Sequence, residues 1–328
     1  MNTKHSWQKA LSDLVTDPEE LLNLLELDKS LLNEAKKASQ KFPLMVTKNF
    51  IARMEKGNPR DPLLLQVLPL GIELQEHENY HADPLEEKNA NPIPGLLHKY
   101  QGRILLTLTS ACAVHCRYCF RRNFPYEENN PGTKGWELIF DYIRKDGEIT
   151  EVILSGGDPL VMSDKLLKSF CDKLSGISHV KRLRFHTRVP VVLPERITEE
   201  FTNWISELPF DVVIVIHMNH PREMNDDVKT AMLALRKAGA TMLNQSVLLK
   251  DINDDAEVLK ELSESLFAAG VLPYYLHVLD KVQGTAHFDM KEDHALNLHA
   301  ELMQTLPGYL VPKLAREEAG KTSKTILI

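Results

Sequence analysis

The sequence is poor in cysteine, in surplus positive charge and in long apolar runs. Its four cysteines in 328 residues are too unevenly spread for a disulfide framework, since three of them crowd together at Cys112, Cys116 and Cys119. Such crowding is typical of a metal site in a reducing compartment. With 46 acidic against 39 basic residues the net charge is −7. This balance argues against nonspecific binding to nucleic acid, because phosphate contacts need surplus lysine and arginine.

Signals for membrane insertion and export are missing as well. No run of about 18 apolar residues occurs, so we expect no ordinary membrane helix. No apolar segment precedes the acidic stretch that begins at Asp13, so we expect no secretory signal. The 43% of hydrophobic and 26% of charged residues are typical of a globular protein. The sequence therefore predicts a globular, cytoplasmic protein.

The first part of the chain has the pattern of short helices joined by polar connectors. Thr16-Asp17-Pro18 is typical of a helix start, since proline is favoured in the first helical turn. A second helix is expected after Thr47. A polar, loop-like stretch then ends near Pro94, where we place a boundary.

From residue 104 onward, β-branched and aliphatic runs alternate with amphipathic helical patterns. Six strands are expected, at residues 104–110, 151–155, 182–188, 211–217, 241–249 and 273–279. Helices are expected between and after them, at residues 134–145, 163–175, 198–208, 224–238, 255–269 and 291–306. This alternation predicts parallel strands with right-handed crossovers, in an open doubly wound sheet or a barrel. We favour an α/β fold with a partial (β/α)6 TIM-like barrel, in which the carboxyl ends of the strands surround a common ligand site.

The three cysteines follow the first predicted strand with the spacing Cys112-x₃-Cys116-x₂-Cys119. Three thiolates from one loop can hold a cubane iron–sulfur cluster and leave its fourth iron open to a ligand. A zinc site is the alternative, but structural zinc takes four protein ligands, and no further cysteine or histidine lies at a suitable spacing. We therefore predict that the three cysteines bind a [4Fe-4S] cluster.

A glycine-rich turn after the second strand strengthens this prediction. Together with the cysteine triplet, Ser155-Gly156-Gly157-Asp158 is similar to the radical S-adenosylmethionine superfamily. The resemblance implies that the open iron chelates S-adenosyl-L-methionine, that the cluster reduces it to a 5′-deoxyadenosyl radical, and that the glycine-rich turn helps to bind this cofactor. Alone, a double glycine would more often be a simple turn between a strand and a helix.

Within that superfamily, nearly the whole chain resembles the lysine 2,3-aminomutases. The shared segments are Cys119-x-Arg121-Arg122, Gly156-Gly157-Asp158-Pro159-Leu160, His217-x-Asn219-His220-Pro221, Asn244-Gln245-Ser246-Val247-Leu248-Leu249 and Val311-Pro312. Residues 274–284 look most like the branch that makes (R)-β-lysine for modification of elongation factor P. The resemblance implies an isomerase that moves the α-amino group of L-lysine to its β-carbon.

Members of this family also bind pyridoxal 5'-phosphate through a lysine near the C-terminus. The distance from Val311-Pro312 implies that this lysine is Lys324, which would be catalytic and would hold the cofactor as an imine. Lys321 is a competitor, because the family's usual run of glycines before the lysine is missing here. The alternative for either lysine is a solvated tail residue.

The resemblance assigns further residues to the substrate and to the cofactor. Arg121 would bind the substrate carboxylate, while Asp280 and Glu317 would bind the ε-ammonium group, although aspartate is usual at the latter position. Arg103 would lie near the phenolic oxygen of pyridoxal phosphate and Gln245 beside it; a salt bridge and a strand-end polar contact are their alternatives. We assign no metal to His217 or His220 at the end of the fourth strand.

These assignments divide the chain into a helical N-terminal region, a radical SAM core and a segment with the cofactor lysine, at residues 1–94, 95–308 and 309–328. The resemblance further implies a reductant such as flavodoxin and a ligase that passes β-lysine to elongation factor P. A homo-oligomer is possible, and neither nucleic acid nor membrane is an expected partner. The alternatives are a catabolic or osmolyte aminomutase, a radical SAM enzyme with another substrate, and a noncatalytic metal-binding module.

Overall fold

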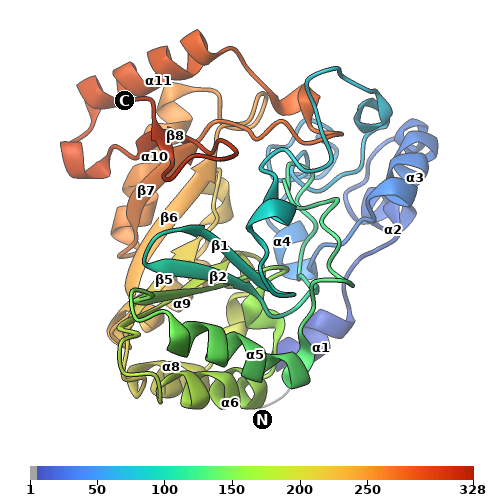
Figure 1. The fold of residues 1–328 in the computed structure, drawn as a ribbon. Coiled ribbons are helices and arrows are strands. Elements are labelled where there is room, and N and C mark those ends of the chain that lie inside the picture. Colours follow the sequence, from blue (N-terminus) through green and yellow to red (C-terminus); the bar gives the residue numbers. More distant parts are fainter. Residues whose placement is uncertain (1–5) are drawn as a thin grey trace.

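The computed structural model describes residues 6–328, and within that range nine strands form one sheet in the order of the chain (Figure 1). Strands β2 to β8 are parallel, whereas β1 and β9 pair antiparallel at the two edges. The strands are β1 (Leu96–Tyr100), β2 (Arg103–Thr107), β3 (Glu151–Ser155), β4 (Arg182–Thr187), β5 (Asp211–Ile216), β6 (Thr241–Val247), β7 (Leu272–His277), β8 (Lys313–Arg316) and β9 (Thr325–Ile326). The predicted partial barrel is confirmed, and the six predicted strands correspond to β2 to β7.

The predicted helices follow these strands and differ from the prediction by one or two residues at their ends. They are α5 (Gly132–Lys145), α6 (Asp164–Leu174), α8 (Glu199–Ser206), α9 (Asp226–Lys237), α10 (Ala256–Ala268) and α11 (Glu292–Thr305), and a short α7 (Val189–Val192) was not predicted. Four of them, α6, α8, α9 and α10, begin at a side chain that accepts a backbone N–H of the first turn: Ser163, Thr198, Asn225 and Asp255. Each such cap stabilises its helix by about 1 kcal/mol.

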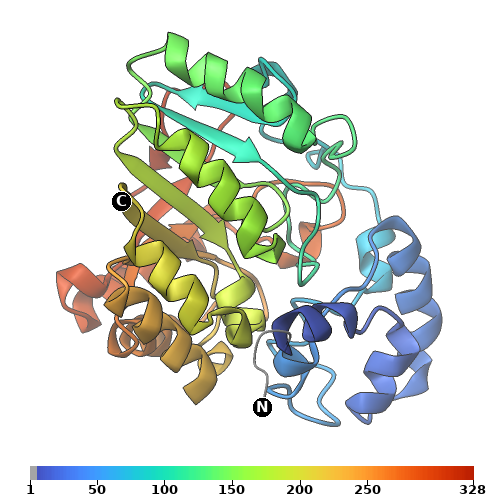
Figure 2. The same ribbon diagram turned by 90° about the horizontal axis from the view of Figure 1, so that it is seen from below.

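The helices α5 and α6 cover one face of the sheet, where they appear as green ribbons in Figure 2. Phe140 of α5 and Phe170 of α6 are fully buried with their ring centroids 5.0 Å apart. All five residues of β3 are buried, as expected for a parallel strand that is covered on both faces. This burial explains why β3 is an apolar run between Glu151 and Ser155, whereas β4 and β6 alternate in burial and carry polar residues along their length.

The N-terminal region consists of short helices that pack beside the cysteine loop (Figure 1). They are α1 (Ser6–Ser12), α2 (Pro18–Leu24), α3 (Leu32–Lys41) and α4 (Lys48–Ile51). The helix predicted at Pro18 and the one predicted after Thr47 are present, the second as a single turn. The backbone N–H groups of His115 and Arg117 donate to the carbonyl oxygens of Met45 and Gln66, both at 2.9 Å. This region therefore supports the loop that carries the cysteines.

The predicted division at Pro94 falls two residues before β1 begins, and the C-terminal segment adds β8 and β9 to the sheet. Residues 1–5 of the predicted N-terminal region lie outside the described residues, and the three-part division stays a prediction. In the part of the chain that the structure describes, no helix is both long and apolar enough to span a membrane.

Candidate active site

A cavity of about 790 Å³ lies at the carboxyl ends of the parallel strands. Every residue that the sequence assigned to a cofactor, cluster or substrate lines it: Arg103, Cys112, Cys116, Cys119, Arg121, Ser155, Gly156, Gly157, Asp158, Gln245, Asp280, Glu317 and Lys324. The volume lies within the range of about 300–1,000 Å³ that is common for small-molecule sites. The strand ends thus bring together residues that are more than 200 positions apart in the chain.

The three cysteine thiols face this cavity from one loop. Burial raises the pKa of Cys112, and nearby Asp158, Cys119 and Cys116 raise it further. Burial, with a contribution from Cys116, also raises the pKa of Cys119 to about 11. Without a metal, thiols with raised pKa values stay protonated at neutral pH. A bound iron displaces the proton, because its positive charge stabilises the thiolate. The triplet therefore fits a cluster bound by thiolates.

The described residues 6–328 contain no group of three His, Cys, Asp or Glu side chains that could hold one metal ion. A cubane needs no such group, because each thiolate binds a different iron of the cluster. Around a single zinc ion, by contrast, thiolate sulfurs at about 2.3 Å from the metal must converge on one point. The arrangement of the cysteines is compatible with the cluster.

The glycine-rich turn lies directly against the start of the cysteine loop. The N–H of Gly157 donates to the carbonyl oxygen of Thr109 at 2.8 Å, and a Cβ at Gly157 would lie 2.2 Å from the carbonyl oxygen of Ala111. Gly156 has a φ of +105°, which side chains rarely allow. Only glycine fits at this close approach, so the turn presents bare backbone to the cavity beside the three cysteines, as a cradle for an amino acid moiety requires.

The side chain of Asp158 is bonded to protein groups. Its carboxylate accepts hydrogen bonds from Thr187 Oγ1 at 2.7 Å, from the N–H of Arg188 at 2.7 Å, and from the N–H groups of Leu160 and Val189. Burial raises the pKa of Asp158 to about 6 against the opposing effect of these donors. Asp158 therefore ties the glycine-rich turn to the end of β4, and its contact with a cofactor stays a prediction.

The two candidate lysines differ clearly in position. Lys324 lines the cavity, with its Nζ 5.8 Å from the centre of the Tyr275 ring, whereas Lys321 is exposed and does not line the cavity. Tyr275 and His277 of β7 form an aromatic wall with their ring centroids 5.3 Å apart. An amine beside such a wall fits the predicted covalent attachment of pyridoxal phosphate at Lys324 better than at Lys321.

Five alternating charges cross the cavity wall from Arg121 to Lys324. Arg121 forms two hydrogen bonds with Glu87, at 2.7 and 2.8 Å. Lys99 Nζ lies 3.2 Å from Glu87 and 3.3 Å from Glu317, which in turn accepts a hydrogen bond from Lys324. Burial would raise the pKa of Glu317, but Lys324 and Lys99 outweigh it and lower this pKa to about 2. Glu317 is therefore ionised at neutral pH and can pair with ammonium groups.

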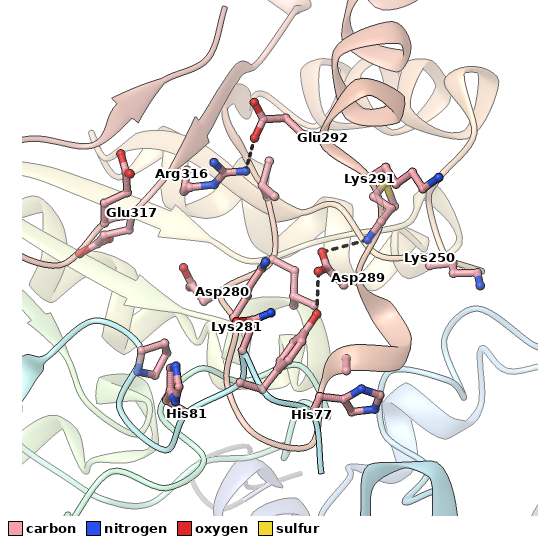
Figure 3. A pocket seen from close by; sticks show the side chains of 18 of the residues that line it. His77, His81, Lys250, Asp280, Lys281, Asp289, Lys291, Glu292, Arg316 and Glu317 are labelled. Carbon is pink, nitrogen blue, oxygen red and sulfur yellow. Dashed lines mark hydrogen bonds and ion pairs between the residues drawn. The ribbon is translucent and has the colours of Figure 1, made fainter. Parts of the chain in front are cut away.

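Asp280 lies near this row, at the boundary with a second cavity of about 1,270 Å³. Asp280, Glu317 and Leu279 line both cavities. Figure 3 shows Asp280 and Glu317 on one side of the second cavity, across from Asp289 and Lys291. Two carboxyl groups therefore lie where the cavities meet.

Burial, and secondarily the charge of Glu317, raise the pKa of Asp280 from 3.8 to about 7. Between pH 4 and pH 7 the folded protein holds a proton that the unfolded chain has lost, so stability falls as pH rises through this window. Above pH 7 the buried, ionised carboxyl group of Asp280 lowers the free energy of unfolding by at most about 4 kcal/mol. We therefore expect Asp280→Asn to raise the free energy of unfolding at pH 8, and to have little effect at pH 4, in urea unfolding of the cofactor-free protein.

Asp289→Asn is the matched control for this prediction. Asp289 lines only the second cavity, and its carboxylate accepts a hydrogen bond from Tyr80 at 2.6 Å. Its amide variant should not gain stability at pH 8. An equal gain in both variants would show that overall net charge, rather than the burial of Asp280, is responsible.

The remaining predicted residues also lie at the cavity wall. The guanidinium of Arg103 lies over the Tyr100 ring, 4.6 Å from its centre, and Nε2 of Gln245 is 3.5 Å from Nε2 of His217. Burial lowers the pKa of His217 to about 3, so it is neutral at physiological pH. His220 does not line the cavity and instead accepts the backbone N–H of Arg222.

Several residues of the site were missed by sequence reasoning, namely Glu87, Lys99 and Arg188. Arg188 is buried, and its Nη1 lies 2.8 Å from the sulfur of Cys116 and 2.8 Å from the hydroxyl of Tyr118. A basic residue at the end of the third predicted strand was a usable signal for Arg188. Glu87 lies in a polar stretch without periodicity, so nothing in the sequence distinguished it from its exposed neighbours.

Comparisons with known proteins agree with this geometry. Residues 106–262 match the family model of the radical SAM superfamily. The L-lysine 2,3-aminomutase of Haemophilus influenzae is 48% identical over 98% of this chain and 96% of its own length. The enzyme of the same name from Escherichia coli is also 48% identical, over 99% and 95%, respectively. The L-lysine 2,3-aminomutase of Clostridium subterminale is 33% identical over 98% of this chain and 77% of its own length.

The cysteine triplet, the glycine cradle and the lysine beside an aromatic wall are thus carried on a sequence that aligns with these relatives over nearly its full extent. The chain belongs to the L-lysine 2,3-aminomutase family within the radical SAM superfamily.

Proposed function

We propose that the protein converts L-lysine to (R)-β-lysine by a radical 1,2-amino migration, as an isomerase. The observation that carries this proposal is the single cavity in which the cysteine triplet, Lys324 and the two carboxylates Asp280 and Glu317 meet. A [4Fe-4S] cluster with S-adenosylmethionine supplies the radical that an unactivated C–H bond requires, and pyridoxal phosphate supplies the conjugated system on which nitrogen can migrate. Amino acid side chains alone can do neither.

Residues of this chain would hold the cluster, S-adenosylmethionine and pyridoxal phosphate in place. Cys112, Cys116 and Cys119 would bind the cluster, and the turn at Gly156-Gly157 would bind the amino acid end of S-adenosylmethionine. We assign the binding of pyridoxal phosphate to Lys324, with Arg103 and Gln245 beside the ring. These assignments are supported by the shared cavity and by the exposure of Lys321.

The charges of the cavity favour a substrate with a carboxylate at one end and an ammonium at the other. Arg121 would bind the carboxylate, while Glu317 and ionised Asp280 would bind the ε-ammonium group. A buried carboxylate left without its cationic partner costs roughly 3–5 kcal/mol, which is enough to reject glutamate and neutral amino acids, because neither brings an ammonium group to Asp280 and Glu317. Lys324 already donates to Glu317 in this structure, so its amine stands where a substrate ammonium could lie.

The test is anaerobic incubation of the protein, reconstituted with iron, sulfide and pyridoxal phosphate, with L-lysine, S-adenosylmethionine and a strong reductant. Chiral chromatography should show β-lysine, with the R form in excess. Cleavage of S-adenosylmethionine without β-lysine would point to a radical SAM enzyme with another substrate. Absence of both iron and sulfide after reconstitution would contradict the proposal.

The wider setting is part of the same proposal. We expect the protein to act in the cytoplasm, where a reductant such as flavodoxin is available, and its product to pass to a ligase that modifies elongation factor P. The resemblance of residues 274–284 to that branch supports this destination over a catabolic or osmolyte role. A purified ligase should transfer the product to elongation factor P, and a ligase that rejects it would favour the alternatives.

A further inference from the structure

Glu87 is a buried carboxylate that reaches the cavity from the N-terminal region. It begins a short 3₁₀ helix, Glu87–Ala90, and is 3% exposed. Burial would raise the pKa of Glu87, but the charges and hydrogen bonds of Arg121 and Lys99 outweigh it and keep this pKa below its usual value. Glu87 is therefore a fixed negative charge between two cations of the site.

The hydrogen bonds of Arg121 show what Glu87 does to it. A guanidinium has five N–H donors. Nε and Nη2 each donate to Glu87, and Nη1 donates to Ser155 Oγ at 3.2 Å, while the ring of Phe120 stacks 4.7 Å from the guanidinium carbon. One N–H on Nη1 and one on Nη2 are left over. Two such donors on the end of a guanidinium match the two oxygens of a carboxylate.

We propose that Glu87 is a positioning residue for the substrate carboxylate: by occupying the Nε and Nη2 edge of Arg121, it leaves the Nη1 and Nη2 end as the one face open to the substrate. The inference rests on the proposed function, in which Arg121 binds the carboxylate of L-lysine. It adds a residue that specifies the direction of this contact. Phe120 and Ser155 then prevent the guanidinium from tilting out of that direction.

Lys99 balances the negative charge of the carboxylate at position 87. When a substrate carboxylate joins Glu87 at Arg121, two negative charges share one guanidinium. Lys99 Nζ, 3.2 Å from Glu87, supplies the second positive charge. The same ammonium lies 3.3 Å from Glu317, so it keeps this second carboxylate as a partner whatever residue stands at position 87.

The test compares Glu87→Asp and Glu87→Gln with the wild type in the reconstituted holoenzyme. Aspartate keeps the charge but is one methylene shorter, so Arg121 should lose one of its two bonds to position 87. We expect the KM for L-lysine to rise about tenfold, as the loss of a charge-assisted hydrogen bond implies, and more in Glu87→Gln. Cadaverine, which has the two amines but no carboxylate, serves as a competitive inhibitor whose inhibition constant should not change in Glu87→Asp.

Glu151→Gln is the matched control. Glu151 is also buried and accepts two hydrogen bonds from an arginine, Arg184, but at the amino end of β3 and outside the cavity lining. Glu151→Gln should lower the Tm and leave the KM for L-lysine unchanged. If Glu87→Gln does not fold, Glu87→Asp still tests the proposal, because it keeps the buried charge pair.

An unchanged KM for L-lysine in folded Glu87→Asp would overturn the proposal, and so would a parallel loss of affinity for L-lysine and cadaverine. The proposed function is tested separately by the wild type. If the wild type makes no β-lysine, calorimetric titration of the holoenzyme with L-lysine and with cadaverine still reports whether Glu87 selects the carboxylate.

Discussion

Lys324→Ala should abolish β-lysine formation and remove the visible absorbance of bound pyridoxal phosphate. The variant loses the amine that lies in the cavity beside Tyr275 and Glu317, and no water or hydroxyl can replace it as the covalent anchor of an aldehyde. The cysteine loop does not depend on this residue, so the iron and sulfide content should equal that of the wild type. Chemical assays of iron and sulfide measure the cluster, and absorbance spectra of the cluster-free protein loaded with pyridoxal phosphate measure the bound cofactor.

Lys321→Ala is the control for this experiment. Lys321 is exposed and outside the cavity lining, so its removal should leave turnover and absorbance unchanged. If Lys321→Ala loses the pyridoxal absorbance and Lys324→Ala keeps it, the assignment of the cofactor lysine is wrong. The position of Lys324 beside Glu317 would then have only an electrostatic role.

Replacing any one of Cys112, Cys116 and Cys119 by alanine should reduce the bound iron and sulfide to background and abolish cleavage of S-adenosylmethionine. The proposed cluster has three thiolates for four irons, so a second open iron leaves it without a stable attachment. Because Arg188 is buried 2.8 Å from the sulfur of Cys116, that variant also leaves a buried guanidinium without one of its partners. We therefore expect Cys116→Ala to have the lowest Tm of the three.

Cys171→Ala controls for the loss of a thiol as such. Cys171 is fully buried in α6, away from the cavity, and burial raises its pKa to about 12. Its replacement should cost about 1–2 kcal/mol of stability through lost packing and leave iron and sulfide at the wild-type level. Retention of a full cluster in any variant of the triplet would contradict the ligand assignment.

The sequence was informative wherever chemistry lies at the end of a periodic segment. The strands β2 to β7 recur in alternation with amphipathic helices, so the strands could be predicted from pattern, and the family resemblance assigned roles to residues near their ends. Strands β1, β8 and β9 were missed for a physical reason. β8 and β9 have only four and two residues, whereas β1 is as long as β2 and β3 but includes His98 and Lys99 among its five residues, so that its pattern did not mark it.

Ion-pair partners were the other class of residue that could not be predicted. Arg121 was assigned through the resemblance to the lysine 2,3-aminomutases, but its partner Glu87 lies 34 positions earlier in an irregular stretch. Lys99 was hidden for the same reason, although it contacts two carboxylates of the site. Which acidic residue meets which basic residue depends on the path of the chain in space, and local sequence carries little information about that path.

Gln66 and Glu87 precede Pro94, yet both reach the active site from outside the barrel. Gln66 accepts a hydrogen bond from Arg188, which contacts Cys116, and Glu87 bonds to Arg121. The change in composition at Pro94 therefore does not mark a place where the polypeptide can be cut into independent modules. A barrel expressed from residue 95 onward would keep its thiols and Lys324. The guanidinium groups of Arg121 and Arg188, however, would lose these hydrogen-bond partners and become exposed where the N-terminal region had covered them.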